Sequence, residues 1–380
     1  MRRRLDTAAQ VFQFILDNSL LLLGGAVLGL AWANADPGGY NEFTRVTRPF
    51  VNDVAMVFFF GLVMKEVYEA MLPGGPLSQP AGAAMPVLAA IGGMVAPASI
   101  YAFFVMSLGR AELMRGWAIP CATDIAFSYL VARLIFRQGH PAIPFLLLLA
   151  IADDVLGLIV LAAFYPQGHI NLGLLLAGLG AAMLGAWLLR RSGVESFWVY
   201  VLGPGLASWI GLHLGGIHPA LAMVPIVPFM PHGKSDLKLF GSRPAMRLAT
   251  MEQFEQWWRS PVQVILMGFG LVNAGVPFTS LGDVTAAVTI ALIAGKPIGV
   301  LGATLIGELF GLRRPAGLNY RALTVMGVTA GIGFTVALFF TTASFPPGPI
   351  LDEAKMGALL SFLAAPLALA LAKALGVSKS

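Results

Sequence analysis

The sequence predicts an all-α polytopic membrane protein with about twelve transmembrane helices. Of the 380 residues, 57% are hydrophobic and 11% are charged, whereas soluble domains carry about 25% charged residues. Apolar runs of roughly 20 residues, long enough to span a bilayer, recur along the chain. A closed β-barrel would instead show alternating segments of about ten residues, and the sequence lacks that pattern.

Apolar runs separated by short loops predict spans along the whole chain. The polar loop from about Pro231 to Glu252 is the expected divide between two halves. We interpret residues 1–380 as one integral membrane domain, in which two triplets of spans form repeats and the other helices serve as scaffold or interface. The predicted spans lie near 15–35, 51–71, 84–108, 117–136, 142–165, 171–190, 196–213, 216–230, 254–277, 284–310, 322–345 and 355–376.

The net charge of +5 could indicate a nucleic-acid partner, but the positions of the basic residues indicate membrane orientation instead. With the N-terminus inside, eighteen of the 24 lysines and arginines fall on the cytoplasmic side, and Lys296 falls within a span. This bias predicts a bacterial-type inner membrane with both termini cytoplasmic. The polar leader shows no cleavage site, so we expect no removable signal peptide. The five basic residues on the opposite side are Arg45, Arg48, Arg110, Arg115 and Lys355.

Residues that usually hold metals or cofactors are scarce. A single cysteine, Cys121, excludes an internal disulfide and a multi-cysteine metal cluster. The five histidines are scattered and form no HExxH motif. We therefore expect no resident cofactor.

Two adjacent carboxylates, Asp153 and Asp154, lie at the centre of the fifth span, in the stretch LLLLAIADDVLGLIV. Each isolated charge at that depth costs roughly 2.5–3.5 kcal/mol on insertion scales, so such residues mark functional sites. Adjacent helix positions point about 100° apart, so we expect one carboxylate to face a cation and the other a structural partner. The alternative is a neutral, protonated pair bonded to backbone in a tight bundle.

The fourth span is interrupted in the stretch AIPCATDIAFSYL. Pro120 removes a backbone donor and kinks or breaks the helix. Thr123 and Asp124 follow, either as an N-cap of a half-helix or as part of a site. The two interpretations are compatible, because a helix broken inside a membrane must line a cavity with its unpaired backbone groups. For Asp124 we favour the functional one.

Lys296 lies near the centre of the tenth span, in ALIAGKPIGV. An unpaired ammonium ion is too costly at that depth, so a carboxylate partner is expected. The alternative is that Lys296 snorkels to an interface, but it lies about two helical turns from either end of the span.

The eleventh span carries TAGIGFTVAL, in which Gly331 and Gly333 permit a break or a close backbone approach. Interrupted spans in corresponding positions suggest inverted-topology repeats with the binding site between them. Spans three to five, at about 84–165, and spans ten to twelve, at about 284–376, would match, each with an interrupted middle member.

At these motifs the chain resembles the NhaA-type sodium/proton antiporters over nearly its whole length. The combination of ATDIAF, a central DD and GKP is highly specific. The resemblance implies inverted repeats whose two broken helices cross at the membrane midplane. The matching motifs, in the family's order, are MPVLAAIGGMVAPA, GWAIPCATDIAF, LAIADDVLGLIVLAAFY, GIHPALA, VNAGV, IAGKPIG and GIGFTVALF.

The resemblance also implies a function and a site. The protein would exchange Na⁺ or Li⁺ for H⁺, and the family's dimers make a homodimer an expectation. Asp153 and Asp154 would form the cation and proton site, with Asp154 as the main sodium ligand and Asp153 paired with Lys296. From the chemistry of hard cations we further expect that both carboxylates, the Thr123 hydroxyl and water hold the ion. Asp124 would face the positive N-termini of the half-helices, whereas Lys296 would face their negative C-termini.

The regions linked to pH sensing in the family differ here. In the family the second helix ends in an acidic and basic run of the type Glu-Xaa-Lys-Arg-Glu. Here the run reads EVYEA: Glu66 keeps the first acid, whereas Glu69 takes the second basic position and Ala70 the last acid position. The cluster before the ninth span, MEQFEQWWRSP, offers Glu252 and Glu255 but no histidine. Glu66, Glu252 and Glu255 are the candidates for a pH response. His218, in GIHPALA, is interpreted as structural.

Chemistry favours ion exchange over two alternatives. Sodium and lithium prefer oxygen ligands, and protons compete with them for carboxylate oxygens. Lys296 is either only a counter-charge to Asp153 or itself a proton carrier. The second role would make the exchange electrogenic, and we favour that role. A sodium-coupled symporter of an organic solute would need more recognition groups. An intramembrane aspartyl protease needs carboxylates on separate helices, so we expect no enzyme.

Overall fold

The computed structural model describes residues 19–233 and 249–377, and every regular element in these ranges is a helix. The polar leader, the start of the first predicted span and most of the polar loop that we expected to divide the chain lie outside the described residues. In the first half the α-helices are α2 (Leu20–Ala35), α3 (Pro37–Phe50), α4 (Met56–Met71), α5 (Pro80–Ser107), α6 (Ile125–Ile135), α7 (Ala142–Phe164), α8 (Leu172–Arg191), α9 (Phe197–Tyr200) and α10 (Leu206–Gly215).

The second half continues the helical bundle, and several helices carry tighter or wider turns. The 3₁₀ helix η2 (Ala111–Cys121) precedes α6, and π-helical turns join three helix pairs: η1 (Val51–Ala55), η3 (Val201–Gly205) and η6 (Ala291–Gly295). The remaining α-helices are α11 (Thr250–Asn273), α12 (Asp283–Ile290), α13 (Lys296–Leu309), α14 (Tyr320–Ala330), α15 (Phe334–Ser344), α16 (Pro349–Leu360) and α17 (Ala364–Ala374).

The lengths and apolar character of these helices are those of a polytopic membrane protein. Within the described ranges, six helices are long and apolar enough to cross a membrane, or eight if each of two bent pairs counts as one span. The two bent pairs are η2 with α6, bent by 52°, and α14 with α15, bent by 48°. The number twelve stays a prediction.

The eighth predicted span, at 216–230, is wrong as a continuous helix. After α10 ends at a left-handed glycine, Gly216, the chain forms turns and two short 3₁₀ helices, Pro219–Leu221 and Val227–Phe229. Pro225 and Pro228 have no backbone N–H to donate, which explains why no regular helix forms here. The segment is nevertheless largely buried, because its apolar side chains pack against neighbouring helices.

The sequence did not predict α3, which lies between the first two expected spans. Its start is well defined: Pro37 occupies the first turn, and the Asp36 carboxylate accepts a hydrogen bond from Gly39 N at 3.0 Å. Most of its residues are polar or only partly buried. The helix therefore lies outside the apolar runs on which the span prediction rested.

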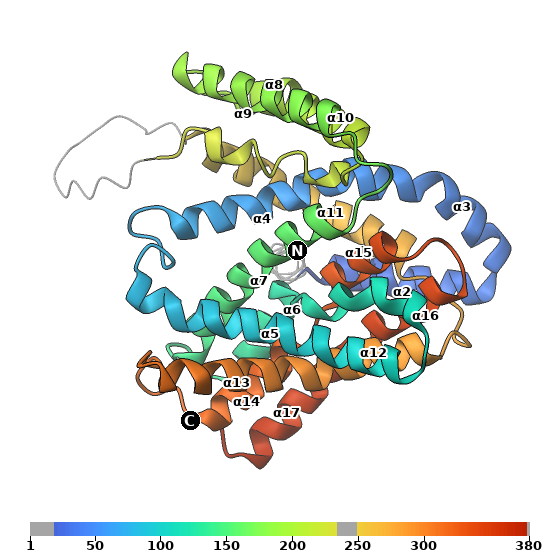
Figure 1. Cartoon of the computed structure of the whole chain (residues 1–380), viewed down its shortest axis with the longest axis vertical. Helices are drawn as coiled ribbons and strands as arrows, with labels where there is room; N and C mark the ends of the chain where they lie inside the picture. The colour runs from blue at the N-terminus through green and yellow to red at the C-terminus, as the bar shows by residue number, and fades with distance from the viewer. Residues whose placement is uncertain (1–18, 234–248, 378–380) are drawn as a thin grey trace, which may run out of the picture.

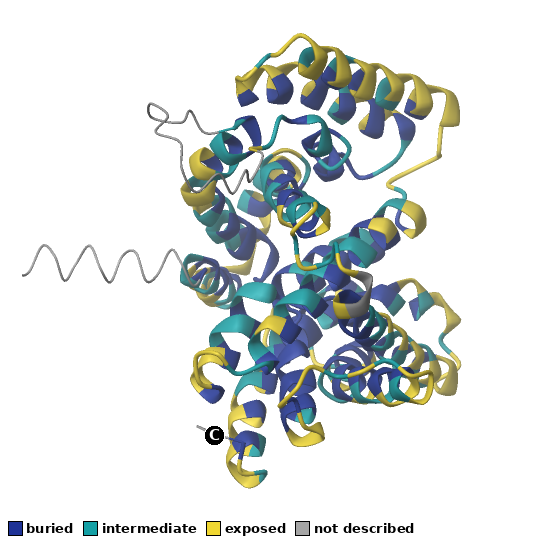
Figure 2. Cartoon of the chain, turned by 90° about the vertical axis from the view of Figure 1, so that its left-hand side faces the viewer, coloured by how far each residue is buried: buried dark blue, intermediate teal, exposed yellow. Residues whose placement is uncertain are grey.

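Helices that are far apart in the sequence pack side by side (Figure 1). The helix α2 packs against α11 and α5 against α13, and α8 and α10, which are close in the sequence, also pack together. In Figure 2, buried residues gather on the helix faces that meet one another, and the outer face of the uppermost helices, α8 and α10, is largely exposed. An apolar exposed face on α8 suits contact with lipid.

Small residues let the helices approach closely. A Cβ atom at Gly299 of α13 would lie 2.0 Å from the carbonyl oxygen of Gly92 in α5. The reciprocal Cβ at Gly92 would lie 2.4 Å from the carbonyl oxygen of Gly299. The two backbones thus meet where neither position has room for a side chain, as at other small-residue contacts between membrane helices.

This contact predicts the effect of a larger residue. We expect Gly299→Leu to force α5 and α13 apart and to lower the free energy of unfolding by about 1–3 kcal/mol or more, the usual cost of overpacking. The matched control is Gly302→Leu on the same helix, where a Cβ atom meets nothing within 4 Å. Thermal unfolding of the purified proteins measures the difference; equal melting temperatures for the two variants would contradict the prediction.

Candidate functional site

The two helix breaks contact one another inside the bundle. Residues 122–124 separate η2 from α6, and residues 331–333 separate α14 from α15. The amide of Asp124 donates a 2.7 Å hydrogen bond to the carbonyl oxygen of Ile332. Backbone groups that the breaks leave without helical partners are therefore partly satisfied by the opposite break.

The glycines of the second break provide room rather than unusual backbone angles. Gly331 and Gly333 have φ values of −68° and −98°, which other residues also adopt. A Cβ atom at Gly333 would lie 2.9 Å from the carbonyl oxygen of Ala122, and one at Gly331 would lie 2.8 Å from that of Leu292. Pro120 lies inside η2, just before the first break, where its missing N–H ends the regular hydrogen bonding.

Asp124 binds the starts of both half-helices. Its Oδ1 accepts a hydrogen bond from Phe127 N at 3.3 Å, which caps α6. Its Oδ2 accepts hydrogen bonds from the backbone N of Thr335 at 3.1 Å and from the Thr335 hydroxyl, at the start of α15. The carboxylate is buried, so the partial positive charge of two helix N-termini offsets its negative charge. The capping interpretation of Asp124 thus describes its contacts.

Asp153 and Lys296 form a buried charge pair. The Lys296 Nζ lies 2.5 Å from Asp153 Oδ2, and both side chains are 0% exposed. The same ammonium group donates to the carbonyl oxygen of Cys121 at 2.5 Å, at the negative C-terminal end of η2. Lys296 directly follows the π-helical turn η6 and does not reach an interface, so the snorkelling alternative does not describe its position.

Thr123 connects the charge pair to the second break. Its hydroxyl oxygen lies 2.7 Å from Asp153 Oδ2 and 3.0 Å from the carbonyl oxygen of Ala330. The other oxygen of this carboxylate, Asp153 Oδ1, is buried and has no hydrogen-bond partner among the described residues. An unpartnered buried carboxylate oxygen is costly, so this atom is available to a ligand that supplies positive charge.

Asp154, the next residue, faces a different environment. It is partly exposed, whereas Asp153 is buried. It lines a cavity of about 270 Å³ to which α2, α4, α6, α7, α11 and α15 contribute. A smaller cavity of about 20 Å³ is lined by both Asp153 and Asp154. The polar residues that line the larger cavity are Ser19, Glu66, Thr123, Asp124, Asp154, Gln263 and Thr335.

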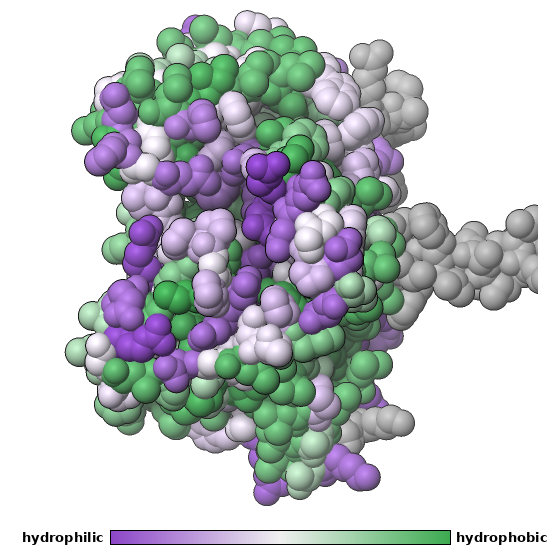
Figure 3. Space-filling model, turned by 90° about the vertical axis from the view of Figure 1, so that its right-hand side faces the viewer, coloured by the Kyte–Doolittle hydropathy of each residue, from purple (hydrophilic) through white to green (hydrophobic). Residues whose placement is uncertain are grey.

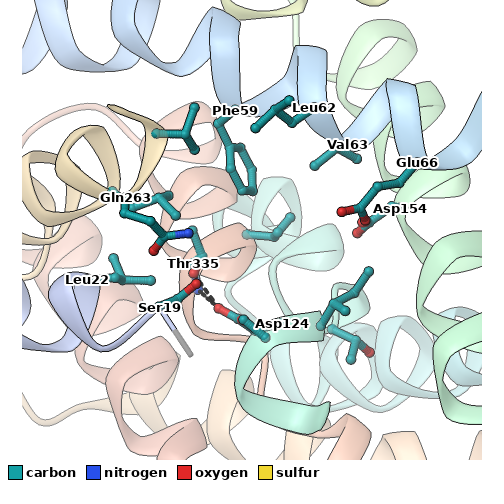
Figure 4. A pocket seen from close by; sticks show the side chains of 16 residues that line it. Ser19, Leu22, Phe59, Leu62, Val63, Glu66, Asp124, Asp154, Gln263 and Thr335 are labelled. Atoms are coloured by element: carbon teal, nitrogen blue, oxygen red, sulfur yellow. Dashed lines mark hydrogen bonds between the residues drawn. The ribbon is translucent and has the colours of Figure 1, made fainter. Parts of the chain in front are cut away.

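The larger cavity has two polar ends (Figure 4). At one end the carboxylates of Glu66 and Asp154 point toward one another, although they come from α4 and α7. At the other end Ser19, Thr335 and Asp124 lie close together. Apolar side chains such as Phe59 occupy the wall between the two ends. The cavity therefore presents oxygen atoms of the kind that hard cations prefer.

The glutamates that we considered for a pH response lie in different settings. Glu66 lines the cavity beside Asp154. Glu255 forms an ion pair with Lys65 of α4, which also pairs with Glu69 at 2.6 Å. Glu252 accepts a hydrogen bond from Ala249 N at 3.2 Å and so stabilises the start of α11.

Two basic residues that we counted toward the charge bias, both near the ends of predicted spans, are buried. Lys65, expected on the cytoplasmic side, is 5% exposed within α4, and Lys355, expected on the opposite side, is 1% exposed within α16. Lys65 is stabilised by its two glutamate partners, which the sequence pattern could not place beside it. Counting basic residues per side of the membrane therefore included two that are not solvated.

His218 has the setting of a structural residue. It is 3% exposed, its Nδ1 accepts a 3.4 Å hydrogen bond from Ala220 N, and its ring lies 4.7 Å from that of Phe339. Its Nδ1 also lies 3.9 Å from Asp53 Oδ1. It does not line the cavity that contains Asp154.

Sequence reasoning missed three polar residues of the cavity: Ser19, Gln263 and Thr335. Thr335 follows the second break within the motif GIGFTVAL, and its position two residues after Gly333 could have been recognised as a half-helix start. Gln263 is a polar residue in the apolar part of α11, and its Oε1 is buried without a partner among the described residues. Ser19 begins α2 and carries no comparable signal.

The chain is similar to known Na⁺/H⁺ antiporters over nearly its whole length. The family model described as Na⁺/H⁺ antiporter 1 matches residues 10–372. The chain is 43% identical to Na⁺/H⁺ antiporter NhaA 2 of Pelobacter propionicus over 95% of this chain and 97% of that protein. It is 42% identical to Na⁺/H⁺ antiporter NhaA of Jannaschia sp., over 97% and 99%, and to that of Desulfitobacterium hafniense, over 99% and 98%.

Proposed function

The chain belongs to the Na⁺/H⁺ antiporter 1 family, and we propose that it exchanges Na⁺ or Li⁺ for H⁺ at a site built around Asp154 and Asp153. Sodium/proton antiport is a transport activity, not an enzymatic one, and it explains why carboxylates lie inside a membrane protein. The observation that carries the proposal is the contrast between the two carboxylates: Asp154 lines a cavity, whereas Asp153 is held by Lys296.

Competition for the same oxygens couples the two ions. A proton on the Asp154 carboxylate removes the charge that attracts Na⁺, and a bound Na⁺ repels the proton. The Asp154 carboxylate, the Thr123 hydroxyl and water would supply the first ligands of the cation. An empty, ionised site is costly to carry across a low-dielectric interior, so the site crosses loaded with either ion.

Lys296 gives the exchange its electrogenic character in this proposal. When Na⁺ approaches, Asp153 can turn from the ammonium group toward the cation, because its Oδ1 is unpartnered and Thr123 lies between the charge pair and the cavity. Lys296 then loses the partner that stabilises its charge and releases its proton. One Na⁺ thus exchanges for more than one proton.

The broken helices supply the means of alternating access. We infer that spans three to five and ten to twelve are inverted repeats, because each contains a helix pair bent by about the same angle, 52° and 48°, and the two breaks share a hydrogen bond. The crossing would lie at the membrane midplane, where one bundle moves against the other. The proposal includes a bacterial inner membrane, cytoplasmic termini and a homodimer, as the charge bias and the family suggest.

The cavity disfavours a symporter of an anionic organic solute. No lysine or arginine is among the residues that line the 270 Å³ cavity, so a carboxylate-bearing solute would find no cationic partner. The polar groups that line the cavity are carboxylates, hydroxyls and one amide, and these groups suit a small cation better.

Everted vesicles with a pH-sensitive dye test the ion specificity. Substrate-driven acidification of the lumen quenches the dye, and export of protons restores its fluorescence. We expect Na⁺ and Li⁺ to restore the fluorescence and K⁺ to have little effect. A response to K⁺ alone would refute the sodium assignment, and a response only to an organic solute would favour the symporter.

A further inference from the structure

A second large cavity, of about 370 Å³, lies at the end of α2 opposite to the exchange site. Ser19 at the start of α2 lines the first cavity, and Ala33 near its end lines the second. Fourteen residues of helix separate them by about 21 Å along the axis. Besides α2, the walls come from α3, the end of α11, and the junction between α15 and α16.

This cavity differs from the first in containing cationic side chains. Arg48 from α3 and Lys355 from α16 both line it, with one carboxylate, Asp352. The formal charges of these three side chains sum to one positive charge. The start of α16, where Gly348 is the N-cap, also borders the cavity, and the dipole of a helix favours an anion at its N-terminus.

Lys355 is the side chain that most needs a partner. It is 1% exposed, and it forms no hydrogen bond or ion pair with any residue in the described parts of the chain. The other buried lysines of these parts each have an ion-pair partner: Lys65 pairs with Glu69 and Glu255, and Lys296 pairs with Asp153. The carboxylate of Asp352 attracts it across the cavity but lies too far away to form an ion pair. A buried charge without a hydrogen bond or ion pair is strongly unfavourable, so this ammonium group is suited to a ligand.

The surrounding polar groups are fixed in place. The Arg48 Nε and Nη2 atoms donate to the carbonyl oxygen of Val272 at 3.2 and 3.1 Å, which orients the guanidinium group. The Tyr40 hydroxyl donates to the carbonyl oxygen of Leu271 at 2.9 Å and accepts from Gly275 N at 3.1 Å. The Tyr40 hydroxyl group is therefore fully used in hydrogen bonds to the backbone of the cavity wall. Arg48 has further N–H donors besides the two that bind the Val272 carbonyl oxygen.

The cavity can be reached from the surface. Pro277 and Pro347, which line it, are exposed. On the side of the molecule where α3 and α16 lie in Figure 1, hydrophilic side chains gather in a band between two apolar regions (Figure 3). A charged ligand in this band can enter without crossing apolar surface.

From this arrangement we propose that Arg48 and Lys355 form a binding site for a single negative charge, on the side of the protein opposite to the cavity that contains Asp154. The ligand is a monoanion: either a free anion such as chloride or the phosphate group of an anionic lipid. When bound there, the anion neutralises the single positive charge that Arg48 and Lys355 have in excess over Asp352. It also contacts both α3 and α16 and so links the two helices. The site is separate from Na⁺/H⁺ exchange.

Thermal unfolding of the full-length protein in detergent tests the site. The wild type is titrated with choline chloride in a zwitterionic buffer without other added salt, and separately with phosphatidylglycerol against phosphatidylcholine in mixed micelles. We expect a saturable rise in melting temperature with one of the two ligands, since a ligand that binds only the folded state stabilises it. Lys355→Met should abolish the rise, and Arg48→Gln should shift it to at least tenfold higher concentration.

The matched control is Lys373→Met, which removes an exposed lysine of α17 and should leave the response intact. A response to chloride identifies a free anion, and a response only to phosphatidylglycerol identifies a lipid phosphate. An equal response of wild type and Lys355→Met, or no response of the wild type to either ligand, overturns the proposal. If Lys355→Met does not fold, Arg48→Gln decides: an unchanged titration overturns the proposal. Na⁺/H⁺ exchange is measured on the same samples, so that loss of exchange is not mistaken for loss of the anion site.

Discussion

Replacing Asp154 with asparagine should reduce Na⁺-driven proton exchange by about 100-fold or more, to the level of empty membranes. Asparagine keeps the shape and one oxygen but removes the negative charge, and an interaction with a charged group contributes up to about 3 kcal/mol. Asp154 lines the cavity, so the charge is lost where we propose that the ions compete. The measurement is sodium uptake into proteoliposomes at several pH values, compared with wild type.

The control for this variant is Asp283→Asn, which removes a carboxylate that pairs with Arg110 and is 48% exposed in its side chain. It should transport normally, because screening weakens the contribution of an exposed ion pair. If Asp154→Asn exchanged sodium at the wild-type rate over the whole pH range, the site would have to lie elsewhere. Loss of exchange with normal thermal unfolding would separate a functional role of Asp154 from a structural one.

Replacing Lys296 with glutamine should have two effects. First, it leaves the Asp153 carboxylate, 0% exposed, without its ion-pair partner, and breaking a buried pair costs roughly 3–5 kcal/mol of folding free energy. Second, if Lys296 carries a proton, the variant should move no net charge for each sodium ion exchanged. Thermal unfolding measures the first effect, and the current in proteoliposomes measures the second.

The double variant Lys296→Gln with Asp153→Asn distinguishes the pair from its single members. Removing both charges should recover most of the stability, because no unpaired charge remains buried. Lys373→Met is the control for removing an exposed lysine. A Lys296→Gln variant that is destabilised but still produces the wild-type current would show that Lys296 is only a counter-charge; unchanged stability would contradict the buried pair itself.

The sequence by itself determined the class of protein and marked the residues around which the proposed site is built. Apolar run length is a local property, so it predicts helices such as α7 and α13 without knowledge of their neighbours. The energetic cost of a charge in a membrane marked Asp153, Asp154 and Lys296 for the same reason. The motif order also indicated the family, which the comparisons confirmed. The local rule failed at 216–230, where two prolines prevent a helix in an apolar run.

Only the tertiary structure decided which of these residues meet. Asp153 and Asp154 are adjacent on α7 but have different neighbours. Asp153 pairs with Lys296, which is 143 residues away in the sequence, whereas Asp154 faces Glu66. Contacts between α4, α7 and α11 depend on helix packing, which no local pattern encodes. The same reason explains why Gln263 lines the cavity, and why Lys355, expected at the membrane edge of the twelfth span, is buried in the cavity that Arg48 also lines. Residue type fixes the cost of burying a charge, whereas packing alone fixes the partner that offsets it.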